Sequence, residues 1–337
     1  MKSKIFFLIC FVFACILFLK QEFFNKSVVE EDIEFYIPTG LSFEGLIEKI
    51  DTISINLNPL VKKVVPFFIE KKRLAYWFRP GRYVFRSGSS FNDIINKLRS
   101  QSQDPVTITF NSMDEVFPIF GIADNALELD SIDLIDYFRS INFPVDSLYF
   151  YMIPNTYEFF WNANPDDFFQ RIKLEYKNFW NYDRLGFLKN NNLSKHEVFV
   201  LASIVDKEAS HFDEMPRIAG LYLNRLKEGW QLASDPTIIY IWKKIHNKSI
   251  RRVRNKHINS TKTSLFNTYH HKGLPPHPIC VPSLQAINAV LIPEKHNYMY
   301  MCAKPDNSEY HDFAIDYREH QKNANAFHRW LNKRKIY

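Results

Sequence analysis

The chain opens with a run of fifteen apolar residues, 5–19, which follows Lys2 and Lys4 and ends at Lys20. A helix needs about 20 apolar residues to cross a bilayer, and two phenylalanines just after the run lengthen it. No small-residue cleavage pattern follows, so we predict an uncleaved anchor rather than a signal peptide. The lysines before the run predict a cytoplasmic N-terminus, with residues 25–337 on the extracytoplasmic side of the membrane.

One pattern, [ST]-G-x-S-F-x-x-[LI]-I-x-K-[IL], occurs at residues 39–50 and again at 87–98. In each copy the glycine suits a turn, Ser42 or Ser90 suits a helix N-cap, and the apolar positions have helical spacing. Each copy also follows a short β-rich stretch. We therefore predict a strand, turn and helix used twice, in a small α+β module at residues 25–105.

A polar linker at residues 101–105 leads to an alternating stretch, 106–110, that predicts a strand. Helical patterns and loops rich in proline and histidine fill the rest, and a last helix is predicted at 317–335. The predicted fold class is α+β, with an anchor at residues 1–24, the small module, and a mixed α/β domain at 106–337.

Composition indicates an ordinary folded protein: 46% of the 337 residues are hydrophobic, and the formal net charge is only +6. That excess is too small to predict a nucleic-acid partner. A basic run from Lys243 through Arg251 to Lys256 fits a solvated surface or an anionic one. With nine glycines and no GxGxxG or Walker pattern, we expect no nucleotide cofactor.

Cysteine and histidine usage leaves one alternative open. Cys280 and Cys302 either form one disulfide in an oxidising compartment or are two isolated thiols. His270, His271 and His277 crowd the loop around Cys280, but their spacing matches no common zinc site, so we expect no metal.

The strongest local signal for chemistry is a helix that begins at a capping box, in which Ser194 and Glu197 satisfy each other's backbone amides. Its apolar residues have 3.6-residue spacing, and continuing that stripe lands on Glu208. Asp206 and Lys207 fall away from the stripe. The stripe residues are Val198, Leu201, Ile204 and Val205.

A glutamate pressed against apolar side chains resists ionisation, so the pKa of Glu208 should rise toward the range of a general acid at neutral pH. The alternative is that Glu208 only marks the end of the helix or pairs with Arg217 or Arg225. A second helix is predicted from Asp213 to Gly229, followed by polar, proline-stiffened loops suited to hydroxylated or amide-bearing ligands.

Four segments in this order, 201–209, 219–226, 234–240 and 267–276, resemble the endolytic murein transglycosylase family, also called the YceG-like family. The resemblance extends to the N-terminal anchor, to a LysM-like module at the repeat, to Pro154-Asn155-Thr156-Tyr157, and to His311-x-Phe313. It covers nearly the whole chain.

The resemblance implies a membrane-anchored lytic transglycosylase of the bacterial inner membrane, a carbon–oxygen lyase of the EC 4.2.2 type. It would cleave peptidoglycan strands between N-acetylmuramic acid and N-acetylglucosamine, leave 1,6-anhydro ends and end strand elongation, with glycan polymerases as possible partners. The family's catalytic acid falls on Glu208. One acid suffices without a cofactor, because the sugar's own 6-hydroxyl replaces the water that glycosidases activate with a second carboxylate.

Beyond Glu208, we expect eight substrate-binding residues. Two positions depart from the family pattern: Asp206 replaces the usual glutamate, and Asn155 replaces an aspartate. A water-using glycoside hydrolase and a non-enzymatic peptidoglycan-binding scaffold are the alternatives. The expected binding residues are Asn155, Tyr157, Asn224, Arg225, Asp235, Thr237, Asn267 and Tyr269.

Overall fold

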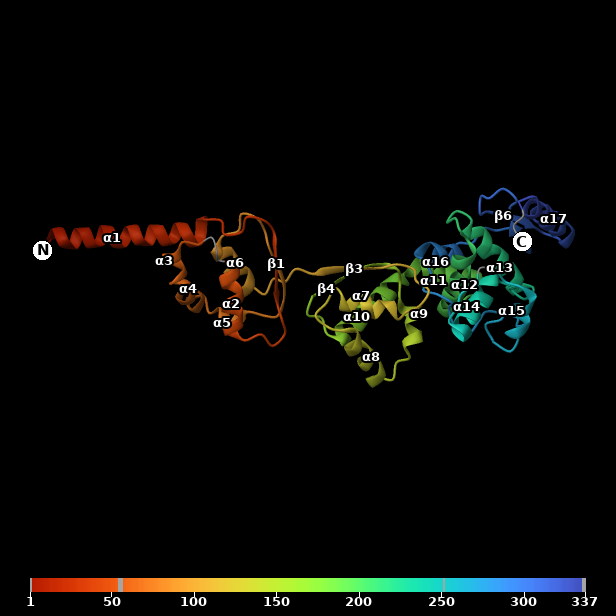
Figure 1. Cartoon of the computed structure of the whole chain (residues 1–337), viewed down its shortest axis with the longest axis horizontal. Coiled ribbons are helices and arrows are strands. Elements are labelled where there is room, and N and C mark those ends of the chain that lie inside the picture. Colours follow the sequence, from red (N-terminus) through yellow and green to blue (C-terminus); the bar gives the residue numbers. More distant parts are fainter. Residues whose placement is uncertain (1, 54–56, 251, 335–337) are drawn as a thin grey trace. The chain divides into compact units, whose positions relative to one another are not determined.

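The computed structural model describes residues 2–53, 57–250 and 252–334. It forms two compact units. The first comprises Met1–Ile108, Phe120–Leu134 and Tyr157–Phe168; the second comprises Thr109–Ile119, Ile135–Thr156 and Phe169–Tyr337. Colour follows the sequence in Figure 1, so each unit can be traced there. Arg251 of the basic run and Lys335 of the predicted last helix lie outside the described residues.

The first unit begins with helix α1 (Lys2–Lys20), which continues into a π-helical segment, η1 (Gln21–Asn25). Together they provide an apolar helix, Ser3–Asn25, long enough to cross a membrane. The apolar N-terminal helix is therefore confirmed. Phe23 does not simply lengthen it, because this side chain is 3% exposed and stacks on Phe68 with ring centroids 4.6 Å apart.

The predicted duplication is confirmed as two strand–turn–helix units. Strand β1 (Ile33–Ile37) pairs antiparallel with β2 (Gly81–Phe85), and helices α2 (Phe43–Ile53) and α6 (Phe91–Arg99) follow them. Gly88 makes the second turn with a φ of +87°, a conformation that favours glycine. Beyond the turn, Ser90 and Asp93 form a capping box at the start of α6.

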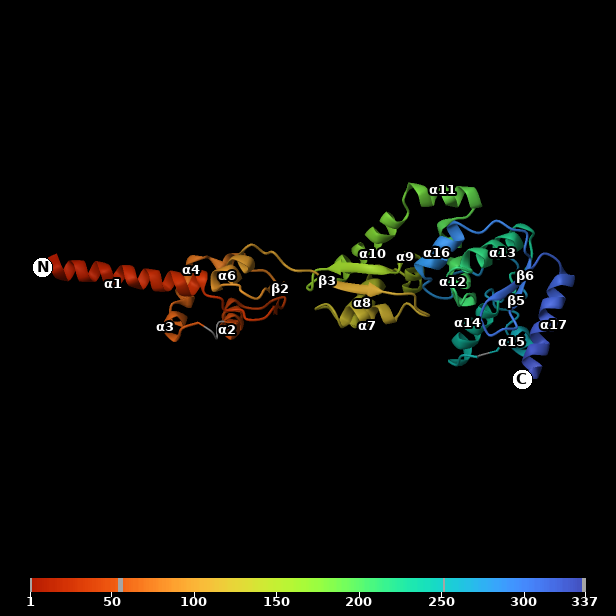
Figure 2. The same ribbon diagram turned by 90° about the horizontal axis from the view of Figure 1, so that it is seen from above.

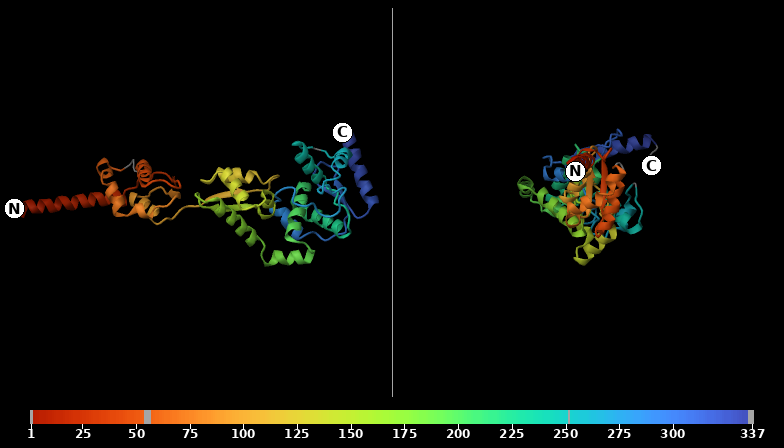
Figure 3. Two further views of the ribbon diagram at one scale, coloured as in Figure 1. Left: turned by 90° about the horizontal axis from the view of Figure 1, so that it is seen from below. Right: turned by 90° about the vertical axis from the view of Figure 1, so that its left-hand side faces the viewer.

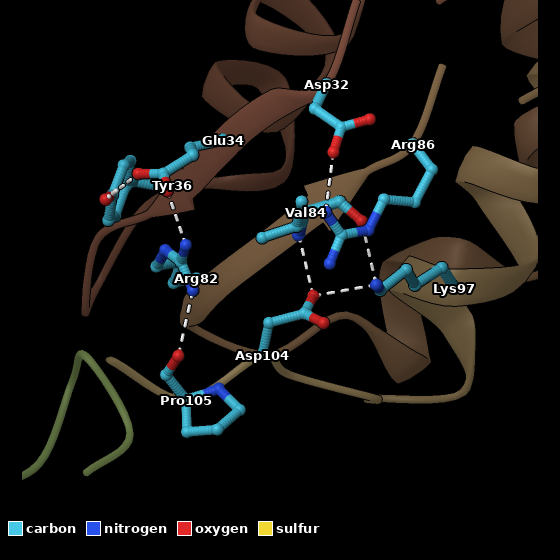
Figure 4. Close-up of polar contacts among 9 residues, drawn as sticks. All are labelled: Asp32, Glu34, Tyr36, Arg82, Val84, Arg86, Lys97, Asp104 and Pro105. Carbon is cyan, nitrogen blue, oxygen red and sulfur yellow. Dashed lines mark hydrogen bonds and ion pairs between the residues drawn. The ribbon is translucent and has the colours of Figure 1, made fainter. Parts of the chain in front are cut away.

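Polar contacts fasten this small sheet to the chain that leaves it (Figure 4). Arg82 on β2 binds the carboxylate of Glu34 on β1 and donates to the carbonyl of Pro105 at 2.9 Å. Asp104 accepts from the backbone amide of Val84 at 2.6 Å and pairs with Lys97 at 2.7 Å. The predicted linker is thus held against the module at its C-terminal end.

Short helices fill the chain between the two strand–turn–helix units and after the linker. Strand β3, predicted at 106–110, pairs with β4. The bounds are α3 (Pro59–Lys62), α4 (Val65–Lys71), α5 (Leu74–Trp77), β3 (Val106–Phe110), α7 (Pro118–Asp124), α8 (Ser131–Ser140), η3 (Val145–Ser147), α9 (Leu148–Tyr151), β4 (Asn155–Phe159), α10 (Pro165–Phe179) and α11 (Tyr182–Asn191).

The second unit is built around helix α12 (Lys195–Glu208), which packs against α13 (Met215–Lys227), α14 (Asp235–His246) and α16 (Leu284–Leu291) (Figure 2). The capping box at its start is confirmed. A single apolar stripe is not: all eight residues from 198 to 205 are buried. Helices on several sides cover α12, so it has no solvent face over this stretch.

The chain ends with α15 (Asn255–Ser260), a hairpin of β5 (Tyr300–Ala303) and β6 (His311–Ala314), and helix α17 (Tyr317–Lys333), which packs on the hairpin (Figures 2 and 3). In the described parts of the chain the strands form three two-stranded sheets among many helices. This mixed content agrees with the predicted α+β class.

Candidate active site

Glu208 is the last residue of α12. The next residue, Ala209, turns to an extended conformation, and its amide still donates to the carbonyl of Val205 at 3.1 Å. The carboxyl group therefore emerges where the buried helix leaves the core. Its position follows from the capping box that starts α12 and from the length of the apolar segment.

Two buried hydroxyl groups converge on one oxygen of this carboxyl group. The Tyr222 hydroxyl, from α13, donates to Oε1 of Glu208 at 2.7 Å, and the Ser234 hydroxyl, just before α14, donates to the same atom at 2.7 Å. Both donor residues are fully buried. Within the described chain no hydrogen bond engages Oε2, so this oxygen is available for proton transfer.

Burial raises the pKa of Glu208, and the hydrogen bonds from Tyr222 and Ser234 partly oppose that rise because they favour the charged form. The charge of Asp235 also raises this pKa, while His311 lowers it. The predicted direction is confirmed. A carboxyl group with a raised pKa keeps its proton closer to neutral pH, as a general acid must.

A buried hydroxyl network holds Ser234. Its amide donates to the Thr268 hydroxyl at 3.0 Å, and Thr237 donates to the Ser234 carbonyl at 2.7 Å. The hydroxyls of Thr237 and Thr268 lie 2.9 Å apart. Ala233 adopts a left-handed φ of +48°, which costs about 1–2 kcal/mol for a residue with a Cβ atom. This strained turn points to a required position for Ser234.

Asp235 and Tyr269 lie next to this network. Asp235 is exposed and accepts a hydrogen bond from the Tyr269 hydroxyl at 2.6 Å. The charge of Asp235 raises the pKa of Glu208, and the charge of Glu208 raises the pKa of Tyr269. The structure therefore brings Asp235 and Tyr269 into the same site as Glu208.

Asn267 is buried, and its side chain is engaged within the protein. Its amide nitrogen donates to the carbonyl of Ile258 at 2.8 Å and to the Thr261 hydroxyl at 3.0 Å, and its oxygen accepts from the amide of Tyr269 at 3.0 Å. Asn267 therefore shapes the loop that carries Tyr269.

Asn224 and Arg225 hold backbone segments. Asn224 donates to the carbonyls of His296 and Tyr298 at 2.9 and 3.1 Å, and Arg225 donates to the carbonyl of Met299 at 2.8 Å and to that of Leu232. Arg225 thus ties α13 to the chain just before Ser234.

The two residues before Glu208 face other neighbours. Asp206 accepts from the amide of Ser283 at 3.1 Å and from its hydroxyl, at the start of α16, and Lys207 pairs with Asp114 at 2.8 Å. Arg217, offered as a partner for Glu208, instead pairs with Glu294 at 3.0 Å. The pairing alternative for Glu208 is wrong.

Asn155 is exposed and donates to Glu175 at 2.9 Å. It lines a groove of ≈ 520 Å³ in the second unit together with Asp206 and Phe212, which is 64% exposed. Tyr157 is fully buried in the first unit, so the structure does not place it with Glu208.

Sequence reasoning missed the donors to Glu208 and the pair formed by buried Glu214 and half-buried His311. Glu214 accepts from the backbone amide and the ring of His311, both at 2.8 Å, and so fastens the chain after Glu208 to β6. In the sequence, Tyr222 belongs to the helix predicted from Asp213 to Gly229, and Ser234 belongs to a polar loop after it. A tyrosine among buried helix positions was the one available signal.

Cys280 is buried and Cys302 half-buried, and both are free thiols, which resolves the open alternative against a disulfide. Burial raises the pKa of Cys302 to about 11. Across residues 2–53, 57–250 and 252–334 no three metal-ligating side chains come together.

Comparison with known proteins identifies the family of this chain. The model of the YceG-like family matches residues 35–326. An endolytic murein transglycosylase of Bacillus subtilis (strain 168) is 27% identical, over 89% of this chain and 88% of that protein. One from Streptococcus pneumoniae serotype 2 (strain D39 / NCTC 7466) is 29% identical, over 41% of this chain and 24% of that protein. A crystal structure of a yceG-like protein from Listeria monocytogenes aligns with 87% of this chain and 98% of its own, at 22% identity and a TM-score of 0.48. Since the family match spans most of its length, the chain belongs to the YceG-like family.

Proposed function

We propose that this protein cleaves peptidoglycan glycan strands internally, between N-acetylmuramic acid and N-acetylglucosamine, with Glu208 as the only acid and base. The observation that carries the proposal is a carboxyl group with a raised pKa, held through one oxygen by Tyr222 and Ser234. Family membership and the names of the relatives support the substrate class.

The reaction needs no water. Protonated Glu208 donates its proton from Oε2 to the glycosidic oxygen as the bond from that oxygen to C1 of the muramoyl sugar breaks. The sugar's 6-hydroxyl attacks C1, forms the 1,6-anhydro bond, and returns its proton to Glu208. Exposed Asp235 supplies negative charge next to the site, which stabilises the oxocarbenium-like transition state.

We propose that the glycan strand binds in the groove lined by Asn155 and Asp206. Hydroxyl and amide side chains line it, and exposed Phe212 offers a flat apolar face to a sugar ring. Ala209, directly after Glu208, lies on its wall. Asp235 and Tyr269 are proposed as direct contacts. Buried Asn267 and Thr237 would act by holding the loops, as would Asn224 and Arg225.

In the cell, α1 would anchor the protein in the inner membrane, with its N-terminus in the cytoplasm and the rest outside. Residues 25–105 would be a LysM-like module that binds peptidoglycan, and residues 106–337 the catalytic domain. Cleavage close to the membrane would end strand elongation beside the glycan polymerases.

The test is mass spectrometry of uncrosslinked glycan strands incubated with the full chain in detergent. We expect anhydro-ended fragments from wild type and none above background from Glu208→Gln. Glu197→Gln is the matched control, because it is the same change at the other end of α12 and glutamine preserves a capping box. Anhydro ends from a folded Glu208→Gln variant would rule out the proposed role of Glu208.

A water-using hydrolase is the second candidate, and the observation in its favour is the carboxylate of Asp235 beside Glu208. Reducing ends instead of anhydro ends in the same experiment would establish it. Strand binding without cleavage by wild type would instead indicate a scaffold.

A further inference from the structure

An apolar groove lies within the first unit, where α1 runs into the module. Its walls are Ile16, Leu19, Lys20, Phe23 and Phe24 from α1 and η1, and Val64, Phe67 and Phe68 from α4 and the residue before it. Its volume is ≈ 520 Å³. We call this the aromatic groove. Figures 1 and 2 show α3 and α4 beside the C-terminal end of α1.

The aromatic groove exposes side chains that a soluble module would normally bury. Phe67 is 65% exposed and Phe24 is 45% exposed. The neighbouring short helices α3 and α5 add Leu60 and Tyr76, which are 70% and 77% exposed. Large exposed apolar surfaces mark sites of interaction with proteins, ligands or membranes.

The aromatic groove is continuous with the segment proposed to cross the membrane. Ile16 and Leu19 belong to the last part of α1, so the groove opens where that helix would leave the hydrocarbon core on the exported side. Phe23 and Phe68 stack with centroids 4.6 Å apart and fix α4 to this end of the helix. Tryptophan and tyrosine are enriched at this depth of a membrane, and neighbouring α5 exposes Tyr76 and Trp77.

Positive charge surrounds the groove. From Asn58 to Trp77 the chain carries five basic residues and one acidic residue, Glu70. Lys63, Lys71 and Arg73 are exposed, and the Lys71 ammonium lies 5.9 Å from the ring centroid of Phe67. Basic side chains close to a bilayer are attracted to anionic lipid headgroups.

We propose that the aromatic groove binds an acyl chain of an anionic phospholipid. Helix α4 would then lie beside α1 in the membrane–water interface on the exported side of the inner membrane. The apolar walls take the hydrocarbon, and the basic side chains of α3–α5 take the headgroup phosphate. The part of the first unit that follows α1 then contacts the membrane surface through α4, in addition to its covalent attachment to α1. This inference depends on the proposed anchoring of α1.

The test uses the full chain in lipid nanodiscs that contain phosphatidylglycerol, with one protein molecule in each nanodisc. A nitroxide label replaces Phe67, Val12 in α1, or exposed Glu48 in α2, in a background with Cys10→Ala, Cys15→Ala and Cys302→Ser. Buried Cys280 is left in place. Collision with oxygen reports a lipid environment, and collision with a nickel chelate reports water.

We expect positions 67 and 12 to show lipid-like collision ratios and position 48 an aqueous one. Nanodiscs of phosphatidylcholine alone should shift position 67 toward the aqueous ratio, as should K62Q/K63Q/K71Q/R73Q. The control K177Q/K189Q/K227Q/K248Q removes as many charges from the second unit and should not shift it.

An aqueous ratio at 67 with a lipid ratio at 12 would overturn the groove proposal and leave the anchor intact. Aqueous ratios at both positions would overturn both proposals. Protection of position 67 from both reagents would mean that protein covers the groove, and would also overturn the lipid assignment.

Discussion

Tyr222 and Ser234, from different elements, donate to the same carboxylate oxygen, Oε1 of Glu208, at 2.7 Å each. Two donors on one oxygen fix the orientation of the carboxyl group and leave its other oxygen for the substrate. This arrangement also sets the pKa, because each donor favours the charged form while burial opposes it.

Tyr222→Phe should lower kcat/KM by about 10- to 150-fold, because a hydrogen bond to a charged group contributes about 1.5–3 kcal/mol. Loss of the donor also raises the pKa of Glu208 further, because Ser234 is then the only hydrogen-bond donor left to favour the charged form against burial. The limb of the pH–rate profile governed by Glu208 should move to higher pH. Tyr36→Phe, which removes a hydroxyl bound to Glu34 in the module, is the control. An unchanged profile would contradict this role of Tyr222.

Ser234→Ala combined with Tyr222→Phe should reduce kcat/KM by more than the two single changes predict. Either single variant leaves one donor on Oε1, whereas the double variant leaves that oxygen unpaired next to buried groups. We expect a coupling energy of about 1 kcal/mol in a double-mutant cycle. Simple additivity would mean that the two hydroxyls act independently.

Glu208→Gln should stabilise the protein more at pH 8 than at pH 4. The folded pKa of Glu208 lies above its unfolded value, so the folded state favours the protonated form. Wild type therefore loses stability as pH rises from the unfolded pKa through the folded one, and the loss persists above it. Glutamine does not ionise and escapes this loss. Thermal unfolding at both pH values measures the difference, and an equal change in Tm at both would argue against a raised pKa.

Gly220→Ala should destabilise the second unit by about 1–3 kcal/mol, as overpacking does. A Cβ atom at Gly220 would lie 2.4 Å from the backbone oxygen of Glu294 and 2.7 Å from Nε2 of His296. Gly186→Ala is the matched control, since its Cβ would meet no atom within 4 Å and alanine is the better helix former in α11. Urea unfolding of both variants provides the measurement; equal midpoints would contradict the close approach at Gly220.

Asp206→Ala should cost about 1–3 kcal/mol of stability, because the Ser283 amide and hydroxyl lose their acceptor at the start of α16. Asp206→Asn retains an acceptor oxygen and should cost less. Both variants should keep kcat within about threefold of wild type, because Asp206 does not contact Glu208. Any larger effect should fall on KM, since Asp206 lines the proposed glycan-binding groove. A loss of kcat as large as that of Glu208→Gln would place Asp206 in the chemistry.

Local patterns in the sequence determined the apolar N-terminal helix, the repeated strand–turn–helix, and the start of α12 at its capping box. They also singled out Glu208, because a carboxylate after a long apolar helix is a conflict visible within one segment. Caps, turns and periodicity act over a few residues, so the sequence displays them directly.

Tertiary structure alone decided which groups meet Glu208. Tyr222 and Ser234 lie 14 and 26 positions away, and only the packing of α13 and of the Thr268 loop against α12 brings them to its carboxyl group. Local patterns likewise did not predict the burial of the Asn267 side chain or of all residues 198–205 of α12. A side chain's exposure depends on which distant segments pack beside it.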